Sequence, residues 1–410
     1  MHIGYYAHHH GSGHCRQADK LAILLSSQSP ESTAEMTVFT SVSEEDYSFT
    51  HLQAKQVVRL PLEHELPDDI LPGRAGAYWQ PDCMHYSPVN NADIKARSLI
   101  LLEQIAQRQI ALMIIDLSVE VALLCRAASI PYLYVRLPGE REDTPHHNAF
   151  QGAIGLLAAY PECLESPETP QWVRQKTLYL GFLQTPKPAD IKSKDIKPKG
   201  TLSKSMFIQQ LRQQYSVAIP SQQNLEAPII TVIKGYGGHA QIDAALPALR
   251  SALPQAFIIS LGPIDSGARQ WVNLAIEVSD TQPFLQHSDL LVMACGLNAI
   301  AEACQATTIA TPLLVIPDER PHREQEMMAQ GLVHCGRAVS LEDFLAQNNS
   351  DSGLAPALDM VTPPTIQTQL QQQLSADFME SLAQADSAKA WFCTWLLPRL
   401  GLTPEAIATS

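Results

Sequence analysis

A histidine follows a glycine turn directly behind the first apolar segment of the chain. The residues read HIGYYAHHHGSGHCRQADKLA, so His14 comes after a turn bounded by Gly11 and Gly13. An imidazole can take up a proton near neutral pH, and glycines let backbone amides approach an anion at the start of a helix. The sequence therefore predicts that His14 is a general base and that this turn contacts an anionic ligand.

A carboxylate is the expected partner of this histidine. Asp116 ends the apolar run ALMIID, where an unpaired buried charge would be costly. Because the carboxyl ends of parallel strands meet at one edge of a sheet, Asp116 can hold the His14 imidazole in one tautomer and raise its basicity. A second interpretation stays open beside this one, in which Asp116 is the N-cap of the next helix, with Ser118 and Glu120 completing the start signal.

A metal site is the competing interpretation of the histidine run. His8, His9 and His10 are adjacent, so they cannot all reach one ion from the end of an extended strand. No carboxylate or cysteine completes a ligand set at the usual spacing. We therefore expect no metal here and interpret two of the three as loop residues.

A second glycine-rich turn lies in the other half of the chain. The segment ITVIKGYGGHAQIDAALPAL places Gly235, Gly237 and Gly238 between a strand and a helix, where backbone amides can bind a diphosphate. No Gly-Lys-Ser/Thr follows, so the turn is not a Walker A motif. Lys234 either adds a charge to that diphosphate or closes the strand.

A further helix start carries a carboxylate. In ACGLNAIAEA, Gly296 stands where a helix begins and Glu302 lies six residues further on. A carboxylate there can accept both hydroxyls of a ribose, whereas the alternative is a solvent-facing residue.

The elements that must position these residues alternate between strand and helix patterns. Such alternation predicts parallel sheets covered by helices, and it occurs twice. Between the two halves lies a Lys/Pro-rich stretch typical of a linker. We therefore predict four segments: 1–183, a linker and connecting helix at 184–225, 226–385, and a C-terminal helix and tail at 386–410. The aperiodic stretch 64–91 is predicted to be a functional loop.

Composition restricts the classes of partner and compartment. The chain has 410 residues and a formal charge of −14, which disfavours general binding to nucleic acids. Eight cysteines without a C-x-x-C pair are typical of reduced thiols, and no segment resembles a signal peptide or a membrane span. These features predict a cytoplasmic protein.

Three motifs resemble those of the GT-B glycosyltransferases, and within them bacterial family 28 enzymes like the peptidoglycan N-acetylglucosaminyltransferase. They are the Gly-Ser-Gly-His at 11–14, CGLNAIAE at 295–302, and PLLVIPDERPHREQEMMA at 312–329. The resemblance implies two Rossmann-like domains facing across a cleft, with a C-terminal helix crossing back to the first. Leu297 and Ala299 depart from the family's Tyr and Thr, so the donor sugar stays open.

The same resemblance implies roles for residues of the second half. Glu302 would bind the donor ribose, and Gly296 and the following amides, including that of Asn298, would bind the diphosphate. Glu324 and Gln325 would bind hydroxyls of the donor sugar, and Arg320 would approach a phosphate. His14 and Asp116 match a histidine base and its aspartate partner in plant-type members.

The resulting hypothesis is an inverting glycosyltransferase that moves a sugar from a nucleotide-diphosphate sugar, UDP-linked by preference, to an acceptor hydroxyl. The resemblance implies no metal and no other cofactor, and the chain has no Asp-X-Asp. A nucleotide-sugar hydrolase is the alternative, and a non-catalytic sugar-nucleotide sensor is the third interpretation. The acceptor, a small molecule or a lipid-linked one, is not named by the sequence, and peripheral contact with the inner membrane face stays open.

Overall fold

The structure of the protein is a computed structural model. It describes residues 2–9, 12–26, 35–62, 81–89, 91–183, 203–215, 227–235, 239–278, 280–306, 311–350, 376 and 378. These residues belong to two compact units, of which the first contains 1–162 and 167–183 and the second contains 163–166 and the described part of 184–380. The predicted C-terminal helix and most of the predicted 64–91 loop lie outside the described residues.

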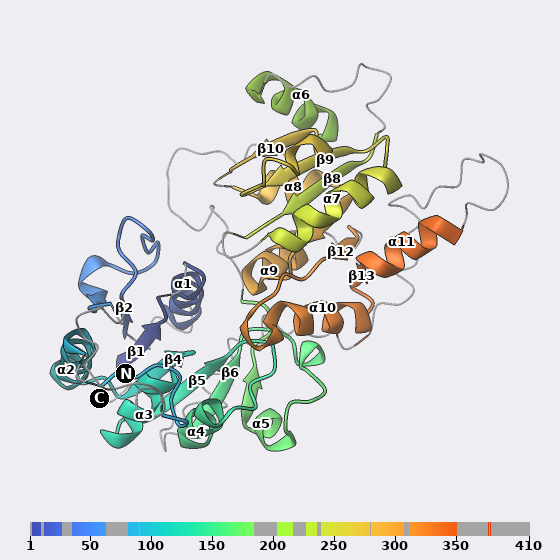
Figure 1. The fold of residues 1–410 in the computed structure, drawn as a ribbon. Helices are drawn as coiled ribbons and strands as arrows, with labels where there is room; N and C mark the ends of the chain where they lie inside the picture. The colour runs from blue at the N-terminus through green and yellow to red at the C-terminus, as the bar shows by residue number, and fades with distance from the viewer. Residues whose placement is uncertain are drawn as a thin grey trace, which may run out of the picture. The chain divides into compact units, whose positions relative to one another are not determined.

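The first half of the chain builds a seven-stranded parallel sheet in the order β3-β2-β1-β4-β5-β6-β7 (Figure 1). Its elements, in chain order, are β1 (His2–Ala7), α1 (Gly13–Ser26), β2 (Glu35–Thr40), the 3-10 helix η1 (Ala54–Gln56), β3 (Val57–Arg59), α2 (Ala92–Gln107), β4 (Leu112–Asp116), α3 (Val119–Ala127), β5 (Tyr132–Arg136), α4 (Thr144–Gly152), β6 (Gly155–Ala158), the 3-10 helix η3 (Glu162–Leu164), α5 (Gln171–Lys176) and β7 (Thr177–Tyr179).

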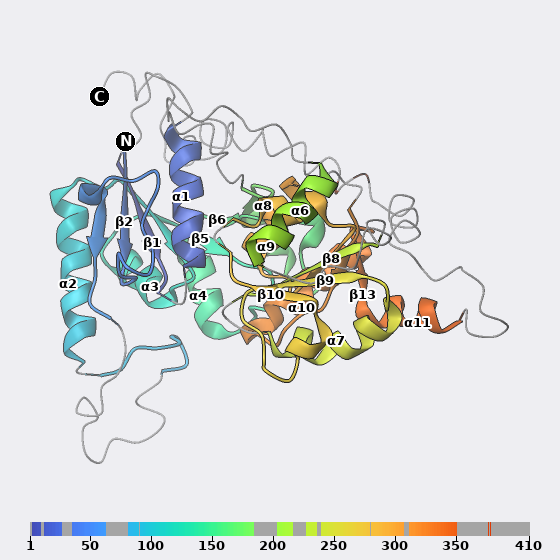
Figure 2. The same ribbon diagram turned by 90° about the horizontal axis from the view of Figure 1, so that it is seen from above.

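Helices cover both faces of this sheet. The strands β4 and β5 are buried along their whole length, as expected for parallel strands that are apolar on both faces. One face packs against α2, α3 and α4 in a core that includes Tyr6, Ile115 and Tyr134. Figure 2 shows α1 and α2 on opposite sides of β1 and β2. This layering leaves the carboxyl ends of the strands to carry the loops.

The second half builds a six-stranded parallel sheet in the order β10-β9-β8-β11-β12-β13. Its elements, in chain order, are α6 (Lys204–Tyr215), β8 (Ile229–Ile233), α7 (Ala240–Ala252), β9 (Phe257–Leu261), the 3-10 helix η6 (Arg269–Trp271), β10 (Leu274–Ile276), α8 (Gln282–His287), β11 (Leu290–Met293), α9 (Leu297–Ala306), β12 (Leu313–Val315), the 3-10 helix η7 (Pro321–Arg323), α10 (Glu324–His334), β13 (Ala338–Ser340) and α11 (Leu341–Ser350).

Alternating residues of β8 enter two different cores. Ile230 and Val232 pack with residues of α7 and α11, whereas Ile229 packs with Phe207 of α6 and Phe284 of α8. Figure 2 accordingly shows α7 on one side of β8 and β9 and α6 on the other. Successive side chains of a strand point to opposite faces, so a run of apolar residues is needed where both faces are covered.

Each sheet has one point where the strand order reverses. In the first unit the reversal lies between β1 and β4, and in the second it lies between β8 and β11. Ligands of open parallel sheets bind outside the carboxyl ends of the strands at such a switch point. The two switch points are therefore where the fold favours binding sites.

A strained residue follows the second strand at each switch point. Leu117 has φ 67° between β4 and α3, and Cys295 has φ 65° between β11 and α9. A left-handed conformation costs a residue other than glycine about 1 kcal/mol or more, and such strain concentrates at functional turns.

Most of the predicted elements are confirmed, as is the α/β class with two parallel sheets. Within the motif at 312–329, helix α10 begins only at Glu324. His322 and Arg323 before it have φ 58° and 53°, which no α-helix accepts. The predicted domain boundaries stay a prediction. Among the residues that the structure describes, no helix is both long and apolar enough to cross a membrane.

Replacing Gly262 by alanine is expected to destabilise the second unit. Gly262 has φ 92°, and a Cβ there would lie 2.9 Å from the backbone oxygen of Lys234. The strain amounts to about 1–3 kcal/mol, so the unfolding temperature measured by calorimetry should fall by several degrees. Gly267→Ala is the matched control, since its Cβ would meet no atom within 4 Å. Equal unfolding temperatures for the two variants would contradict this account.

Candidate functional site

His14 and Asp116 meet at the switch point of the first sheet. His14 lies in the first turn of α1, directly after β1, and Asp116 is the last residue of the neighbouring strand β4. The distance from His14 Nδ1 to Asp116 Oδ2 is 2.9 Å, and the two side chains are 14% and 1% exposed. With Nδ1 bound to the carboxylate, Nε2 is the ring nitrogen that can exchange a proton.

A tyrosine hydroxyl holds the same carboxylate from the neighbouring strand. Tyr5 donates a hydrogen bond to Asp116 Oδ2 at 2.8 Å, and both side chains are buried. Burial, followed by the nearby Asp116 charge, raises the pKa of Tyr5 well above its usual value. Tyr5 therefore keeps its proton and remains a hydrogen-bond donor, which fixes the carboxylate that orients His14.

The N-cap interpretation of Asp116 is wrong. The cap of α3 is Ser118, whose hydroxyl accepts a hydrogen bond from the backbone N–H of Val121. Glu120 is also not a mere start signal, because its Oε1 accepts hydrogen bonds from the backbone N–H groups of His85 and Tyr86. Asp116 therefore does not cap α3, and its carboxylate contacts His14 and Tyr5.

The histidine run is only partly described. The rings of His8 and His9 stack at 4.7 Å between centroids, and His8 lies edge-on to His14 at 5.7 Å. In the described part of the chain these three belong to no group of ligand atoms that one ion could reach. His10 and Gly11 lie outside the described residues, whereas Gly13 is the first residue of α1.

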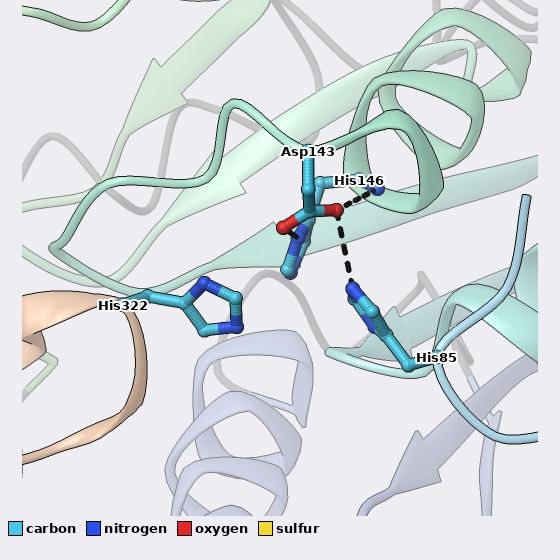
Figure 3. Close-up of side chains that lie close together, drawn as sticks. All are labelled: His85, Asp143, His146 and His322. Carbon is cyan, nitrogen blue, oxygen red and sulfur yellow. Dashed lines mark hydrogen bonds and ion pairs between the residues drawn. The ribbon is translucent and has the colours of Figure 1, made fainter. Parts of the chain in front are cut away.

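A second cluster of histidines in the first unit was not predicted. Figure 3 shows Asp143 with His85 and His146, and its dashed lines mark the contacts. His146 Nδ1 lies 2.7 Å from Asp143 Oδ2, and His85 Nε2 lies 3.1 Å from Asp143 Oδ1. Arg141 Nη1 lies 3.2 Å from His146 Nε2. The only signal in the sequence is the cap pattern Asp-Thr-Pro at the start of α4, where Asp143 is the N-cap.

This cluster holds a neutral imidazole rather than a titrating one. Arg141 can only donate, so His146 Nε2 accepts and Nδ1 carries the proton that is donated to Asp143. Burial, and then the Arg141 charge, lowers the pKa of His146 from 6.5 to about 3. Although burial opposes it, hydrogen bonds from the backbone and ring of His146 hold the pKa of Asp143 well below its usual value. The pair is therefore a fixed anchor for His85 at neutral pH.

Two glycines of the second unit border open space at the switch point. Gly235 follows β8 and Gly296 follows β11, and a Cβ at either position would meet no atom within 4 Å. The backbone at both turns can therefore be approached closely by a ligand. Gly237 and Gly238, predicted for the same role as Gly235, lie outside the described residues.

Glu302, which is predicted to bind the donor ribose, is half-buried. Glu302 lies on α9, and its Oε2 accepts a hydrogen bond from the Thr281 hydroxyl at 3.3 Å. Asn298 lies half-buried in the first turn of the same helix. The Glu302 carboxylate therefore lies about one and a half turns from the N-terminus of α9.

The residues predicted to bind the donor sugar and its phosphate follow β12 in the chain. Gln325 is buried, and its Oε1 accepts a hydrogen bond from the Asp318 backbone N–H at 2.9 Å. This hydrogen bond from the Asp318 backbone fixes the loop against the start of α10. Glu324 begins α10, and Arg320 is the N-cap of η7, both half-buried. All three lie within the loop and helix start that follow one strand.

Lys234 closes the strand rather than facing a phosphate. Its ammonium group is fully buried and lies 2.6 Å from Asp243 Oδ1. Burial lowers the pKa of Lys234, while the Asp243 carboxylate acts in the opposite direction. The buried pair ties the end of β8 to α7.

No protein-family model matches the chain, and no curated protein sequence matches it.

Solved structures match over nearly the whole chain. A UDP-glucose:anthocyanidin 3-O-glucosyltransferase in complex with UDP matches with 13% identity and a TM-score of 0.54, covering 100% of this chain and 99% of its own. A UGT transferase from Siraitia grosvenorii with UDP matches with 13% identity and a TM-score of 0.51, covering 98% of each. The spinosyn forosaminyltransferase SpnP matches with 11% identity and a TM-score of 0.51, covering 95% of each. The chain has the GT-B fold.

Each unit of this GT-B fold has its predicted residues at its own switch point. His14 and Asp116 flank the β1/β4 reversal, and Gly235 and Gly296 flank the β8/β11 reversal. The role of these four residues stays a prediction, and the His85–Asp143–His146 cluster was not predicted from the sequence.

The neutral state of His146 predicts a dependence of stability on pH. A folded-state pKa below the unfolded value stabilises the protein above about pH 6.5, and this contribution is lost as the pH falls toward the folded value. Relative to His146→Gln, the wild type should lose up to about 1.4 kcal/mol of unfolding free energy per pH unit below 6.5. Urea unfolding of the two proteins at pH 7.5, 6 and 5 measures this. Parallel pH profiles would refute the assignment.

Proposed function

We propose that the protein is an inverting glycosyltransferase that moves a sugar from a nucleotide-diphosphate sugar to an acceptor hydroxyl. The observation that carries the proposal is the contact of His14 Nδ1 with the buried Asp116 carboxylate at the switch point of the first sheet. The solved neighbours are named as glycosyltransferases, and two of them hold UDP, so UDP is the donor nucleotide that we propose.

His14 is the base in this proposal. The acceptor oxygen attacks the anomeric carbon, the bond from that carbon to the diphosphate breaks, and the diphosphate leaves with the electron pair. The acceptor proton passes to His14 Nε2, and the Asp116 carboxylate stabilises the imidazolium that forms. Tyr5 keeps the carboxylate in place through its hydrogen bond at 2.8 Å. Attack from the face opposite the leaving group inverts the configuration of the sugar.

The second unit binds the donor in this proposal. The open turns at Gly235 and Gly296 admit the diphosphate to backbone amides, and the N-terminus of α9 adds its positive dipole end. Glu302 accepts hydrogen bonds from the ribose hydroxyls. Among the residues that follow β12 in the chain, Glu324 and the NH₂ group of Gln325 bind sugar hydroxyls, and Arg320 approaches a phosphate.

The transfer needs no metal in this proposal. Amides at a helix N-terminus stabilise the charge that develops on the leaving diphosphate without an ion. Donor binding and turnover are therefore expected to persist in EDTA.

Transfer is preferred over the two other interpretations of the sequence. The neighbours' names describe transferases, which gives the nucleotide-sugar hydrolase no support. A sensor would not need a histidine held by a buried carboxylate. The acceptor, its lipid or small-molecule character, and a cytoplasmic location with or without peripheral membrane contact stay predictions.

Removal of the Glu302 carboxylate is expected to weaken nucleotide binding. A charged hydrogen bond contributes about 1.5–3 kcal/mol, so Glu302→Ala should raise the Kd for one nucleotide by about 10- to 100-fold. Calorimetric titration with UDP, dTDP and GDP in EDTA measures the Kd and names the donor class.

The matched control for this titration is Glu342→Ala, which removes an exposed carboxylate from α11. It should bind the nucleotide as the wild type does. If the folded wild type binds none of the three nucleotides, the proposed function is wrong.

A further inference from the structure

A group of potential metal ligands in the second unit is not used by the proposed transfer. His239 precedes α7, Asp243 lies one turn into it, and Asp265 follows β9. Their ligand atoms all lie within 4.8 Å of one another. Because β8 and β9 are neighbours, the group stands at the carboxyl edge of the sheet, directly after the glycine-rich turn.

The distances from His239 to the two carboxylates are those between ligands of one ion and are longer than ordinary hydrogen bonds. His239 Nε2 lies 3.6 Å from Asp243 Oδ2 and 3.5 Å from Asp265 Oδ1. Two ligand atoms about 2.1 Å from one Zn²⁺ at the tetrahedral angle are about 3.4 Å apart. His239 Nε2 thus lies about as far from each of the two carboxylate oxygens as two ligands of one Zn²⁺ lie from each other.

The carboxylate at the centre of the group is held in place by its surroundings. Asp243 is 4% exposed, and its Oδ1 is bound to the buried Lys234 ammonium at 2.6 Å. Its Oδ2 accepts the backbone N–H of Asp265 at 2.9 Å, which also brings the Asp265 side chain to the site. Such outer contacts orient metal ligands and reduce the cost of assembling a site. The side chains of His239 and Asp265 are 25% and 70% exposed, so an ion can enter from solvent.

Charge favours a divalent cation at this position. Two carboxylates and one buried ammonium leave a net charge of about −1 before the imidazole is counted, and an ion of charge 2+ is attracted to it. Imidazole and carboxylate donors suit Zn²⁺, which would leave its fourth position to water or another ligand.

The His85–Asp143–His146 cluster, by contrast, is not suited to a metal ion. Its atoms are already joined by hydrogen bonds of 2.7 and 3.1 Å, and Arg141 donates to the second nitrogen of His146. A metal on His146 Nδ1 would displace the proton that this arrangement requires. The two clusters contain similar residues, but the imidazole of His146 is held to its neighbours by hydrogen bonds. The imidazole of His239 lies 3.5 and 3.6 Å from its two carboxylates.

We propose that His239, Asp243 and Asp265 form a Zn²⁺-binding site beside the glycine-rich turn of the second unit. This goes beyond the proposed function, which uses no metal, and it can hold or fail independently of it. The site was not predicted from the sequence, because His239 and Asp243 are four residues apart while Asp265 comes from a different loop.

The test is titration of the full chain with Zn²⁺ alone, in competition with a chromophoric chelator. Asp265→Asn should bind one tight equivalent fewer than the wild type or bind it at least about tenfold more weakly, since even outer contacts of a metal contribute that much. Because Asp265 is exposed and its backbone N–H remains, the variant should keep its fold. His239→Gln should give the same loss. Asp243→Asn is avoided because it would leave Lys234 buried without its carboxylate.

Asp280→Asn is the matched control, since Asp280 is an exposed aspartate of the same unit. It should retain the wild-type number of Zn²⁺ ions, and Zn²⁺ should raise the unfolding temperature of this control but not of Asp265→Asn. The proposal is overturned if all these proteins bind the same number of Zn²⁺ ions with the same affinity. Because no nucleotide is present, that outcome would leave the glycosyltransferase proposal intact.

Discussion

The carboxylate of Asp116 organises the first unit, because it is a charge buried at the end of a central strand and must be satisfied there. It is 1% exposed, and Tyr5 from the next strand and His14 from the following helix both bind it. Removing a partner from a buried charged group costs about 1–3 kcal/mol or more. β1, β4 and the start of α1 are thereby fixed relative to one another, and the histidine that they present is held in one orientation.

The second unit repeats this arrangement with different chemistry. The Lys234–Asp243 pair is buried at the end of β8, as Asp116 is at the end of β4, and it ties the strand to the helix behind the turn. In both units a residue with positive φ follows a strand of the switch point. Leu117 follows β4, the strand that carries Asp116, and Cys295 follows β11, the neighbour of β8. In our proposals, the same topology supports proton transfer in one unit and the binding of anions and cations in the other.

The sequence predicts site residues where an apolar run meets a turn, but not clusters that are assembled across loops. His14, Asp116, Gly235 and Gly296 stand at such positions, and the structure places all four at the switch points of the sheets. The role of Lys234 could not be decided, since only the fold shows that Asp243 covers its ammonium group. Part of the His85–Asp143–His146 and His239–Asp243–Asp265 clusters is local, because each holds one pair three or four residues apart. The third member of each, His85 or Asp265, comes from a separate loop, and residue spacing carries no signal for such contacts.

The central claim is that His14, oriented by Asp116, takes the acceptor proton, and kinetics of His14→Gln test it most directly. Removal of a general base lowers turnover by about 100-fold or more, while the Kd for the donor nucleotide should stay as in the wild type. His51→Gln, at an exposed histidine of the same unit, is the control and should transfer sugar normally. Wild-type turnover in His14→Gln would contradict the account.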